Sequence, residues 1–337
     1  MRNIYDLTIK ELEDYFISIN EKKFRAVQVY EALYKRRIKS FDDMTNISKE
    51  VREKLKQVFS FYKIKMLIKQ QGKNVNKYLF ELEDGNKIES VLMFHDYGTS
   101  ICVSSQVGCN MTCAFCESGR LKKVRNLLAY EIVQQILQIE EDINKRITHV
   151  VLMGIGEPFD NYDNVLRFVK IINCGKGIDI GSRHITISTC GVIPGIKKFM
   201  NEEGQVNLAI SLHAPNNTLR SRIMPINKAY PLNELMETIK EYINKTNRRV
   251  TFEYIMLDNV NDSEENAKEL ALLLKGINCY VNLIPYNETE NIEFKRTKEW
   301  KIMKFYDILK KNKINVTIRK EFGGSVDAAC GQLRANN

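Results

Sequence analysis

Long apolar runs are absent from this sequence of 337 residues. No stretch reaches the roughly eighteen consecutive apolar residues that a membrane-spanning helix needs. Polar side chains interrupt even the longest uncharged stretch, residues 97–116. The first sixteen residues carry acidic side chains where a secretory signal would need an apolar core. We therefore expect a cytoplasmic protein that does not interact with membranes.

Low-complexity linkers and internal repeats are also absent, and the composition is ordinary for a folded protein. Hydrophobic residues make up 44% of the chain and charged residues 28%, which excludes wholesale disorder and collagen-like repeats. The length suits about two ordinary domains, or one large barrel with an appendage. Because no flexible linker separates them, we expect these parts to pack firmly against each other.

Acidic residues are the minority among the charged ones. Lysine and arginine number 51 against 42 aspartates and glutamates, for a net charge of +9. Residues 1–70 carry 16 basic and 10 acidic residues, so two thirds of the excess lies there. Basic and apolar side chains alternate in residues 22–25 and 35–39, as on a helix that lies along RNA phosphates. A solvated helical face would carry the same pattern, so charge alone leaves both interpretations open.

Cysteine is scarce and unevenly placed. Four of the eight cysteines fall within the fifteen residues from Cys102 to Cys116, a spacing typical of metal or redox sites. A disulfide framework is not expected in a chain of this length without an export signal. Cys174, Cys190 and Cys279 lie in apolar or β-like surroundings, and we expect them to be buried as small hydrophobic side chains.

The hydrophobic pattern divides the chain into three parts. Residues 1–72 have helical spacing of apolar side chains and form the expected N-terminal RNA-binding domain. Residues 73–95 alternate around Asp84-Gly85, which predicts a β-hairpin connector. Residues 96–337 alternate between strands and helices. This pattern predicts a parallel sheet with an active site at the carboxyl ends of its strands.

The number of strand–helix units determines the shape of the third part. Six or seven units suit an open, partial barrel better than a closed eightfold one. We therefore predict the fold class α/β, with a partial (β/α)6-type barrel after a small basic helical domain. The expected strands are 101–104, 149–153, 184–188, 206–212, 250–256, 280–284 and 315–318.

Cys109, Cys113 and Cys116 have the spacing C-x3-C-x2-C and directly follow the first predicted barrel strand. Three thiolates at this spacing can hold three irons of a cubic [4Fe–4S] cluster and leave the fourth iron open to a substrate or cofactor. A structural zinc site would need a fourth ligand at short range. His95 and His149 are the nearest histidines, and neither has regular finger spacing. We expect the cluster.

This loop resembles that of the radical S-adenosylmethionine (SAM) enzymes, and the similarity continues along the chain. The resemblance is to the RlmN/Cfr family of RNA methyltransferases. It implies a radical SAM enzyme that methylates carbon 2 of an adenosine in large-subunit (23S) rRNA, with tRNA as a further substrate. Carbon 8, the target of the Cfr-like antibiotic-resistance branch, is the alternative. The matching segments are 101–109, 153–158, 211–215, 224–227 and 327–333.

The resemblance also implies a ping-pong radical mechanism that uses two SAM molecules per turnover. One SAM methylates Cys330, on an expected C-terminal catalytic loop. A second SAM, bound at the cluster, is cleaved reductively to a radical that takes a hydrogen atom from this methyl group. The methylene radical then adds to the adenine, whose amidine carbon is electrophilic and cannot attack a methyl sulfonium. The electron would come from a donor such as flavodoxin or ferredoxin.

Two further residues match the positions that resolve the enzyme–RNA adduct. By resemblance, Glu89 accepts the ring proton, and the Cys102 thiol releases Cys330 by forming a disulfide with it. The residues alone favour simpler roles, namely a solvent-facing strand position for Glu89 and a core position for Cys102. The resemblance reverses that preference.

The SAM contacts implied by the resemblance follow the ends of the later strands. Gly156 would permit close approach of the backbone, and the Glu157 carboxylate would accept a hydrogen bond from the SAM ammonium group. A dinucleotide site is excluded, because Phe159 replaces the third glycine of that fingerprint. The other matching positions are Ser188, Ser211, Leu212, His213 and Asn287.

The sequence departs from the family pattern directly after Cys116. Glu117 replaces a small neutral residue and Lys122 replaces a glycine, both near the expected RNA entrance.

An alternative from another class is a non-catalytic RNA-binding protein whose cysteine loop holds a structural metal. That protein would be colourless and would not need Cys330, whereas a [4Fe–4S] enzyme would be brown and oxygen-sensitive.

Overall fold

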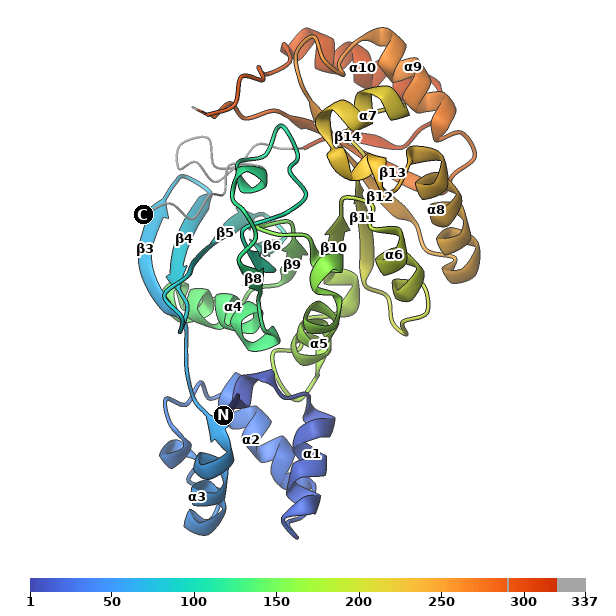
Figure 1. Cartoon of the computed structure of the whole chain (residues 1–337). Helices are drawn as coiled ribbons and strands as arrows, with labels where there is room; N and C mark the ends of the chain where they lie inside the picture. Colours follow the sequence, from blue (N-terminus) through green and yellow to red (C-terminus); the bar gives the residue numbers. More distant parts are fainter. Residues whose placement is uncertain (290, 320–337) are drawn as a thin grey trace.

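The structure is a computed structural model that describes residues 1–289 and 291–319. Cys330 and the expected C-terminal catalytic loop lie outside the described residues. Within the described part, a group of N-terminal helices packs against the helices that cover one face of a large, strongly curved sheet (Figure 1).

Two of the N-terminal helices, α1 and α3, begin at residues whose side chains cap them. At the start of the first, Thr8 and Glu11 form a reciprocal capping box. At the start of the third, the Ser48 side chain accepts a hydrogen bond from the Val51 backbone. The elements of this part are β1 (Arg2–Asn3), η1 (Ile4–Asp6), α1 (Ile9–Ser18), α2 (Phe24–Tyr34), η2 (Phe41–Asp43), α3 (Lys49–Val58) and β2 (Phe59–Ser60).

Ten of the described strands form one sheet in the order β14-β13-β12-β11-β10-β9-β6-β5-β4-β3. Neighbours from β6 to β14 are parallel, whereas β3 to β6 pair antiparallel. The strands are β3 (Lys65–Gln71), β4 (Val75–Glu81), β5 (Lys87–His95), β6 (Gly98–Cys102), β9 (His149–Leu152), β10 (Ile185–Thr189), β11 (Asn207–Ser211), β12 (Val250–Met256), β13 (Cys279–Pro285) and β14 (Val316–Ile318).

Helices connect the parallel strands and cover their outer face (Figure 1). The main core lies between these layers, where strand side chains such as Val150, Ile187 and Leu208 are buried. The helices are α4 (Ala129–Ile143), α5 (Tyr162–Asn173), α6 (Ile193–Phe199), α7 (Asn217–Ile223), α8 (Leu232–Thr246), α9 (Glu264–Leu273) and α10 (Glu299–Lys311), with the short 3-10 turns η3 (Glu117–Arg120), η4 (Pro158–Asn161), η5 (Ser182–His184) and η6 (Pro225–Lys228).

The predicted fold class is confirmed. Each of the seven predicted barrel strands is present to within a few residues. The hairpin around Asp84-Gly85 is also present, between β4 and β5. It does not stand apart from the sheet, because β5 pairs with β6 and β3 adds a further antiparallel strand. The division of the chain into three domains remains a prediction.

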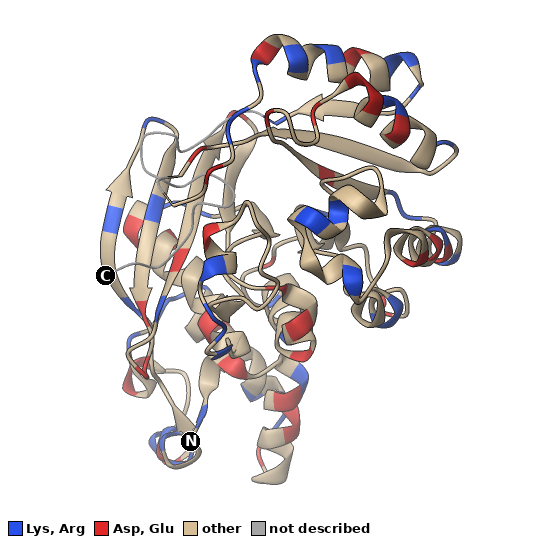
Figure 2. Cartoon of the chain, turned by 45° about the horizontal axis from the view of Figure 1, so that its top comes forward, with Lys and Arg blue, Asp and Glu red and all other residues tan. Residues whose placement is uncertain are grey.

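Ion pairs join the N-terminal helices to the helices that cover the sheet. Arg37 pairs with Glu140 at the end of α4. In α5, Arg167 Nη1 lies 2.6 Å from Glu11 Oε2. In Figure 2, acidic and basic positions are interspersed along the outer helices. In the described part of the chain, no helix combines the length and apolar character needed to cross a membrane.

Candidate functional site: a cavity under a cysteine loop

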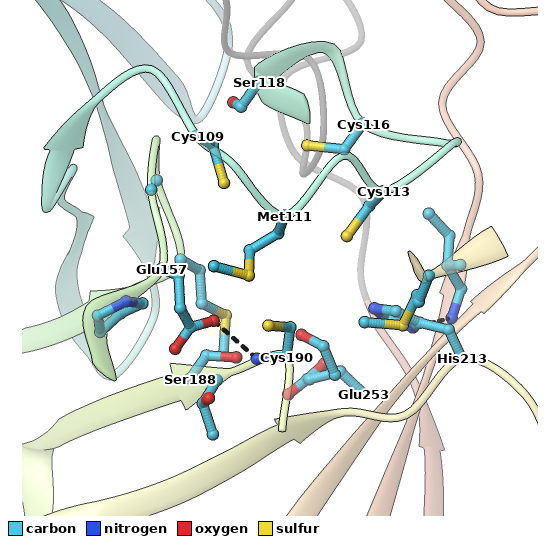
Figure 3. Close-up of a pocket in the computed structure, with 18 of the residues that line it drawn as sticks. Cys109, Met111, Cys113, Cys116, Ser118, Glu157, Ser188, Cys190, His213 and Glu253 are labelled. Carbon is cyan, nitrogen blue, oxygen red and sulfur yellow. Dashed lines mark hydrogen bonds between the residues drawn. The ribbon is translucent and has the colours of Figure 1, made fainter. Parts of the chain in front are cut away.

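A cavity lies at the carboxyl ends of the parallel strands, under the loop that carries the clustered cysteines (Figure 3). Cys109, Cys113 and Cys116 line one side of it. The opposite side is formed by residues at the ends of β9, β10, β11 and β12, including Glu157, Ser188 and Glu253. This edge of the sheet is where parallel α/β folds hold their ligands, because the loops after the strands converge there.

The cysteine loop is fixed to the sheet at its base and at its tip. At its base, the short strands β7 (Gln106–Val107) and β8 (Arg125–Asn126) pair antiparallel. At its tip, the Ala114 N–H donates to the Ile223 carbonyl oxygen at the end of α7, at 2.9 Å. Gly108 permits the turn between them: its φ is +72°, and a Cβ there would lie 2.3 Å from the Lys122 oxygen.

Burial of the cysteine loop favours the protonated form of two of its thiols. Burial raises the pKa of Cys109 to about 12 and raises that of Cys113 well above the ordinary thiol value. Within residues 1–289 and 291–319, no three His, Cys, Asp or Glu side chains converge on a single metal ion. Three thiols that line one cavity without meeting at a point fit a multi-iron cluster better than one zinc ion.

Glu157 faces the cysteine loop from the end of β9 (Figure 3). It is 3% exposed, and its two carboxylate oxygens accept hydrogen bonds from the Phe159 N–H (3.0 Å) and the Cys190 N–H (2.8 Å). Burial raises its pKa, although these hydrogen bonds oppose the rise. Each oxygen retains a second lone pair, so the carboxylate can still accept a donor from a bound ligand.

His213 lines the cavity as a neutral ring. Its Nδ1 accepts a hydrogen bond from the Ile255 N–H at 3.0 Å, which places the ring proton on Nε2. Burial, assisted by the nearby charge of Arg220, lowers the pKa of His213 to about 3. Phe115, from the cysteine loop, packs edge-on against the ring with centroids 4.9 Å apart. The side chain is therefore a fixed hydrogen-bond donor rather than an acid–base group.

The other predicted SAM contacts are only partly brought together. Gly156, Ser188 and Ser211 line the cavity. Leu212 is fully buried beside it, with its N–H donating to the Glu253 carbonyl oxygen at 3.1 Å. Asn287 lies in the loop after β13 and is not among the lining residues.

The two predicted adduct-resolving residues lie on the sheet next to the cavity lining. Glu89 in β5 is 5% exposed, so it is not solvent-facing, and its Oε1 lies 2.9 Å from the Lys77 Nζ. Cys102, the last residue of β6, is buried in a small apolar cluster with Val91 and Ile155. This cluster packs against Met153, which lines the cavity. Cys102 is therefore separated from the cavity by side chains of this cluster, and Glu89 is not among the residues that line the cavity.

Three residues of the site were missed by sequence reasoning. Cys190, expected only as a small hydrophobic side chain, lines the cavity. Glu253 in β12 also lines it, with Oε1 accepting a hydrogen bond from Asn282 Nδ2 at 2.9 Å. Arg220 in α7 is fully buried just behind the lining. The sequence did contain a signal for Glu253, because it is a charged residue within a mostly apolar strand. No local pattern indicated that Arg220 is buried.

Comparisons with known proteins agree with this geometry. Two family models match: the ribosomal RNA large subunit methyltransferase N-terminal domain over residues 2–61, and the radical SAM superfamily over residues 103–271. A "probable dual-specificity RNA methyltransferase RlmN" of Spiroplasma citri is 54% identical over 341 residues, covering 100% of this chain and 98% of that protein. The chain belongs to the RlmN family.

Further relatives support membership of the RlmN family along the whole chain. A protein of the same name from Geobacillus kaustophilus is 53% identical and covers 99% of this chain and 92% of its own length. A crystal structure of a radical SAM methyltransferase from Sphaerobacter thermophilus superposes with a TM-score of 0.94 at 41% identity and covers 100% of both chains. The predicted enzyme class, a radical SAM methyltransferase, is confirmed. The superfamily implies SAM and a [4Fe–4S] cluster as cofactors.

Proposed function

We propose that this enzyme methylates carbon 2 of an adenosine in large-subunit rRNA, with tRNA as a second substrate. The cavity is the observation that carries the proposal: three thiols of one loop face Glu157 and His213 across a space at the strand ends. The family description of residues 2–61 supports the rRNA substrate. The relatives' designation as dual-specificity RNA methyltransferases supports more than one RNA substrate.

In this proposal, residues of the cavity hold both cofactors. Cys109, Cys113 and Cys116 bind the [4Fe–4S] cluster as thiolates, releasing their protons when it binds. When bound, the cluster supplies the electron that cleaves SAM to a radical. Glu157 accepts a hydrogen bond from the SAM ammonium group, and His213 donates from Nε2. The remaining proposed SAM contacts are Gly156, Ser188, Ser211, Leu212 and Asn287, and each turnover uses two SAM molecules.

Three residues act on the RNA side of the reaction. Cys330 accepts the first methyl group and carries the carbon to the adenine. Glu89 then removes the ring proton, with its carboxylate held in place by Lys77 at 2.9 Å. The Cys102 thiolate attacks the Cys330 sulfur, so that a disulfide forms as the carbon–sulfur bond to the base breaks, and the released carbon takes up a proton to become the methyl group. A small electron-transfer protein of the flavodoxin or ferredoxin class supplies the reducing electron.

Anaerobic turnover tests this proposal directly. Wild-type enzyme and Cys330→Ala are incubated with large-subunit rRNA or tRNA, SAM and dithionite, and the RNA nucleosides are then identified by mass spectrometry. We expect 2-methyladenosine from both RNAs with the wild type and none with the variant. An 8-methyladenosine product would instead assign the activity of the Cfr-like branch. One segment of this chain is closer to that branch, Arg319-Lys320-Glu321-Phe322-Gly323. Colourless, iron-free protein that binds RNA without methylating it would support a non-catalytic function.

A further inference from the structure

Arg220 is a fully buried arginine that lies behind the wall of the cavity. Its exposed fraction is 0%. Its guanidinium donates to the carbonyl oxygens of Cys190 (2.6 Å), Leu212 (3.2 Å) and Ser211 (3.3 Å), and to Asn227 Oδ1 (3.0 Å). All four acceptors are neutral, and no carboxylate in the described residues forms an ion pair with Arg220. The hydrogen bonds satisfy the guanidinium donors but do not neutralise the charge.

An uncompensated charge in a protein interior is strongly unfavourable unless an opposite charge lies nearby. The groups that accept hydrogen bonds from Arg220 do not supply one. His213 is a neutral ring. An anionic group bound in the cavity would therefore supply an opposite charge that these hydrogen bonds do not.

The helix that carries Arg220 is attached to the cysteine loop. The Ala114 N–H, between Cys113 and Cys116, donates to the Ile223 carbonyl oxygen one turn after Arg220. The residue after Ile223, Met224, lines the cavity with the three cysteines. The position of the guanidinium relative to the loop is therefore set by backbone hydrogen bonds.

We propose that Arg220 is a positioning residue whose fixed positive charge balances the anionic cluster and favours its reduced form. This inference rests on the proposed function, in which Cys109, Cys113 and Cys116 hold the cluster. Three thiolates make that centre anionic, and reduction adds one electron and one more negative charge. A nearby fixed cation lowers the free energy of the reduced form more than that of the oxidised form, because net charge is a main determinant of cluster potential.

The test is a redox titration of anaerobically purified, cluster-loaded enzyme, followed by visible and electron paramagnetic resonance spectra. Arg220→Gln removes the positive charge. Arg220→Lys keeps the positive charge but lacks the planar guanidinium that makes the four hydrogen bonds. The matched control is Arg222→Gln, which removes the same charge from an exposed position of the same helix. At a fixed potential near the wild-type midpoint, we expect the reduced-to-oxidised ratio to fall at least about tenfold in Arg220→Gln, or about 59 mV for one electron.

The other variants separate charge from hydrogen bonding. We expect Arg220→Lys to stay within about threefold of the wild-type ratio, and Arg222→Gln to be unchanged, because water and salt screen its charge. Wild-type ratios in a fully iron-loaded Arg220→Gln, or an equal fall in Arg220→Lys, would overturn the counter-charge role. If Arg220→Gln does not fold, the reduced-to-oxidised ratio of Arg220→Lys is the deciding measurement. If Arg220→Lys does not fold either, Arg220 has a structural role only. A failure of the proposed function would appear differently, as wild-type protein without iron.

Discussion

At the scale of single residues, three of the side chains proposed to act in the reaction, Glu157, His213 and Glu89, are buried, and each has a particular neighbour. Two backbone N–H groups hold Glu157, one holds His213, and Lys77 holds Glu89. Burial makes these partners important, because a buried polar or charged group that loses its partner is strongly destabilised. The partner of a catalytic residue is therefore as sensitive to substitution as the residue itself.

The Lys77–Glu89 ion pair provides a test at this scale. Its side chains are only 10% and 6% exposed. We expect Lys77→Met to lower the free energy of unfolding by about 3 kcal/mol, because it removes the cation from a buried ion pair. The double variant Lys77→Met/Glu89→Gln should regain at least half of that loss. Urea denaturation of the apoprotein measures both.

The matched control for this pair is an ion pair between β3 and the end of β4, in the neighbouring strand pair of the same sheet. Lys65 Nζ lies 4.0 Å from Glu81 Oε2, with side chains 72% and 36% exposed. We expect Lys65→Met to change stability by less than about 1 kcal/mol, as for other exposed pairs. Equal losses in Lys77→Met and Lys65→Met would show that burial does not strengthen the first pair.

At the scale of secondary-structure elements, one arginine joins three parts of the site's support. Arg125, in β8 at the base of the cysteine loop, makes a bidentate contact with Glu131 of α4 at 2.8 Å and 2.8 Å. Its Nε also lies 2.6 Å from Asp84 in the β4–β5 turn, and this bond holds the pKa of Asp84 at about 2. The hairpin, the loop and the helix are thus connected through one guanidinium.

We therefore predict that Arg125→Met affects both stability and cluster retention. The Glu131 side chain is 2% exposed, so loss of its arginine should cost about 3 kcal/mol of unfolding free energy. The cysteine loop would also lose a tether at its base, and we expect a measurable fall in iron bound per chain after gel filtration. Arg125→Lys keeps the charge but cannot form the two parallel bonds, so its losses should be intermediate. Full iron content and wild-type stability in Arg125→Met would contradict this description.

At the scale of the whole molecule, ion pairs attach the N-terminal helices to the barrel, and Glu11 makes this attachment sensitive to acid. Burial alone would raise the pKa of Glu11, but hydrogen bonds from Arg167, Thr8 and Arg2 outweigh it and hold the pKa at about 2. An unfolded glutamate has a pKa near about 4.3. The stabilisation is therefore complete above that value and is lost as the pH falls towards the folded pKa.

We expect the stability difference between wild type and Glu11→Gln to shrink between pH 6 and pH 3. The change should be less than about 1 kcal/mol, because the Glu11 side chain is 32% exposed and solvent screens its ion pairs. Chemical denaturation at the two pH values measures it. Asp14→Asn, at an exposed position of the same helix, is the control. A difference that grows on acidification would have the wrong sign for this mechanism.

The basic N-terminal segment 35–39 is the candidate for long-range contact with RNA, and the structure refines which of its residues to test. Arg37 pairs with Glu140 and belongs to the attachment of the helices. Lys35 and Arg36 are exposed. We expect Lys35→Gln/Arg36→Gln to weaken RNA binding and to reduce the slope of log K against log salt by about 1 to 2. Lys310→Gln/Lys311→Gln removes the same charge from α10 and should leave the slope unchanged. Equal effects of the two double variants on the salt slope would show that residues 35–39 contribute to RNA binding only through the net charge of the protein.

Periodic patterns explain how much of the fold was predictable. Strand segments such as 250–256 are mostly apolar because most of their side chains are buried, and Asp84-Gly85 is a local turn signal. Both were located correctly from the sequence. The joining of the hairpin to the barrel sheet was missed. β5 pairs with β6 across a tight connection, but the parallel pairing of β6 with β9 depends on contacts between segments far apart in sequence.

For the site, the sequence by itself determined the residues whose chemistry depends on close spacing along the chain. Cys109, Cys113 and Cys116 lie on one short loop, so their spacing alone indicated a shared centre. Only the tertiary structure decided which distant residues join them. Glu253 and Arg220 come from separate strand–helix units, and their roles follow from burial and from neighbours more than a hundred residues away in the cysteine loop. Burial and electrostatic surroundings are properties of the packed molecule, and no local pattern contains them.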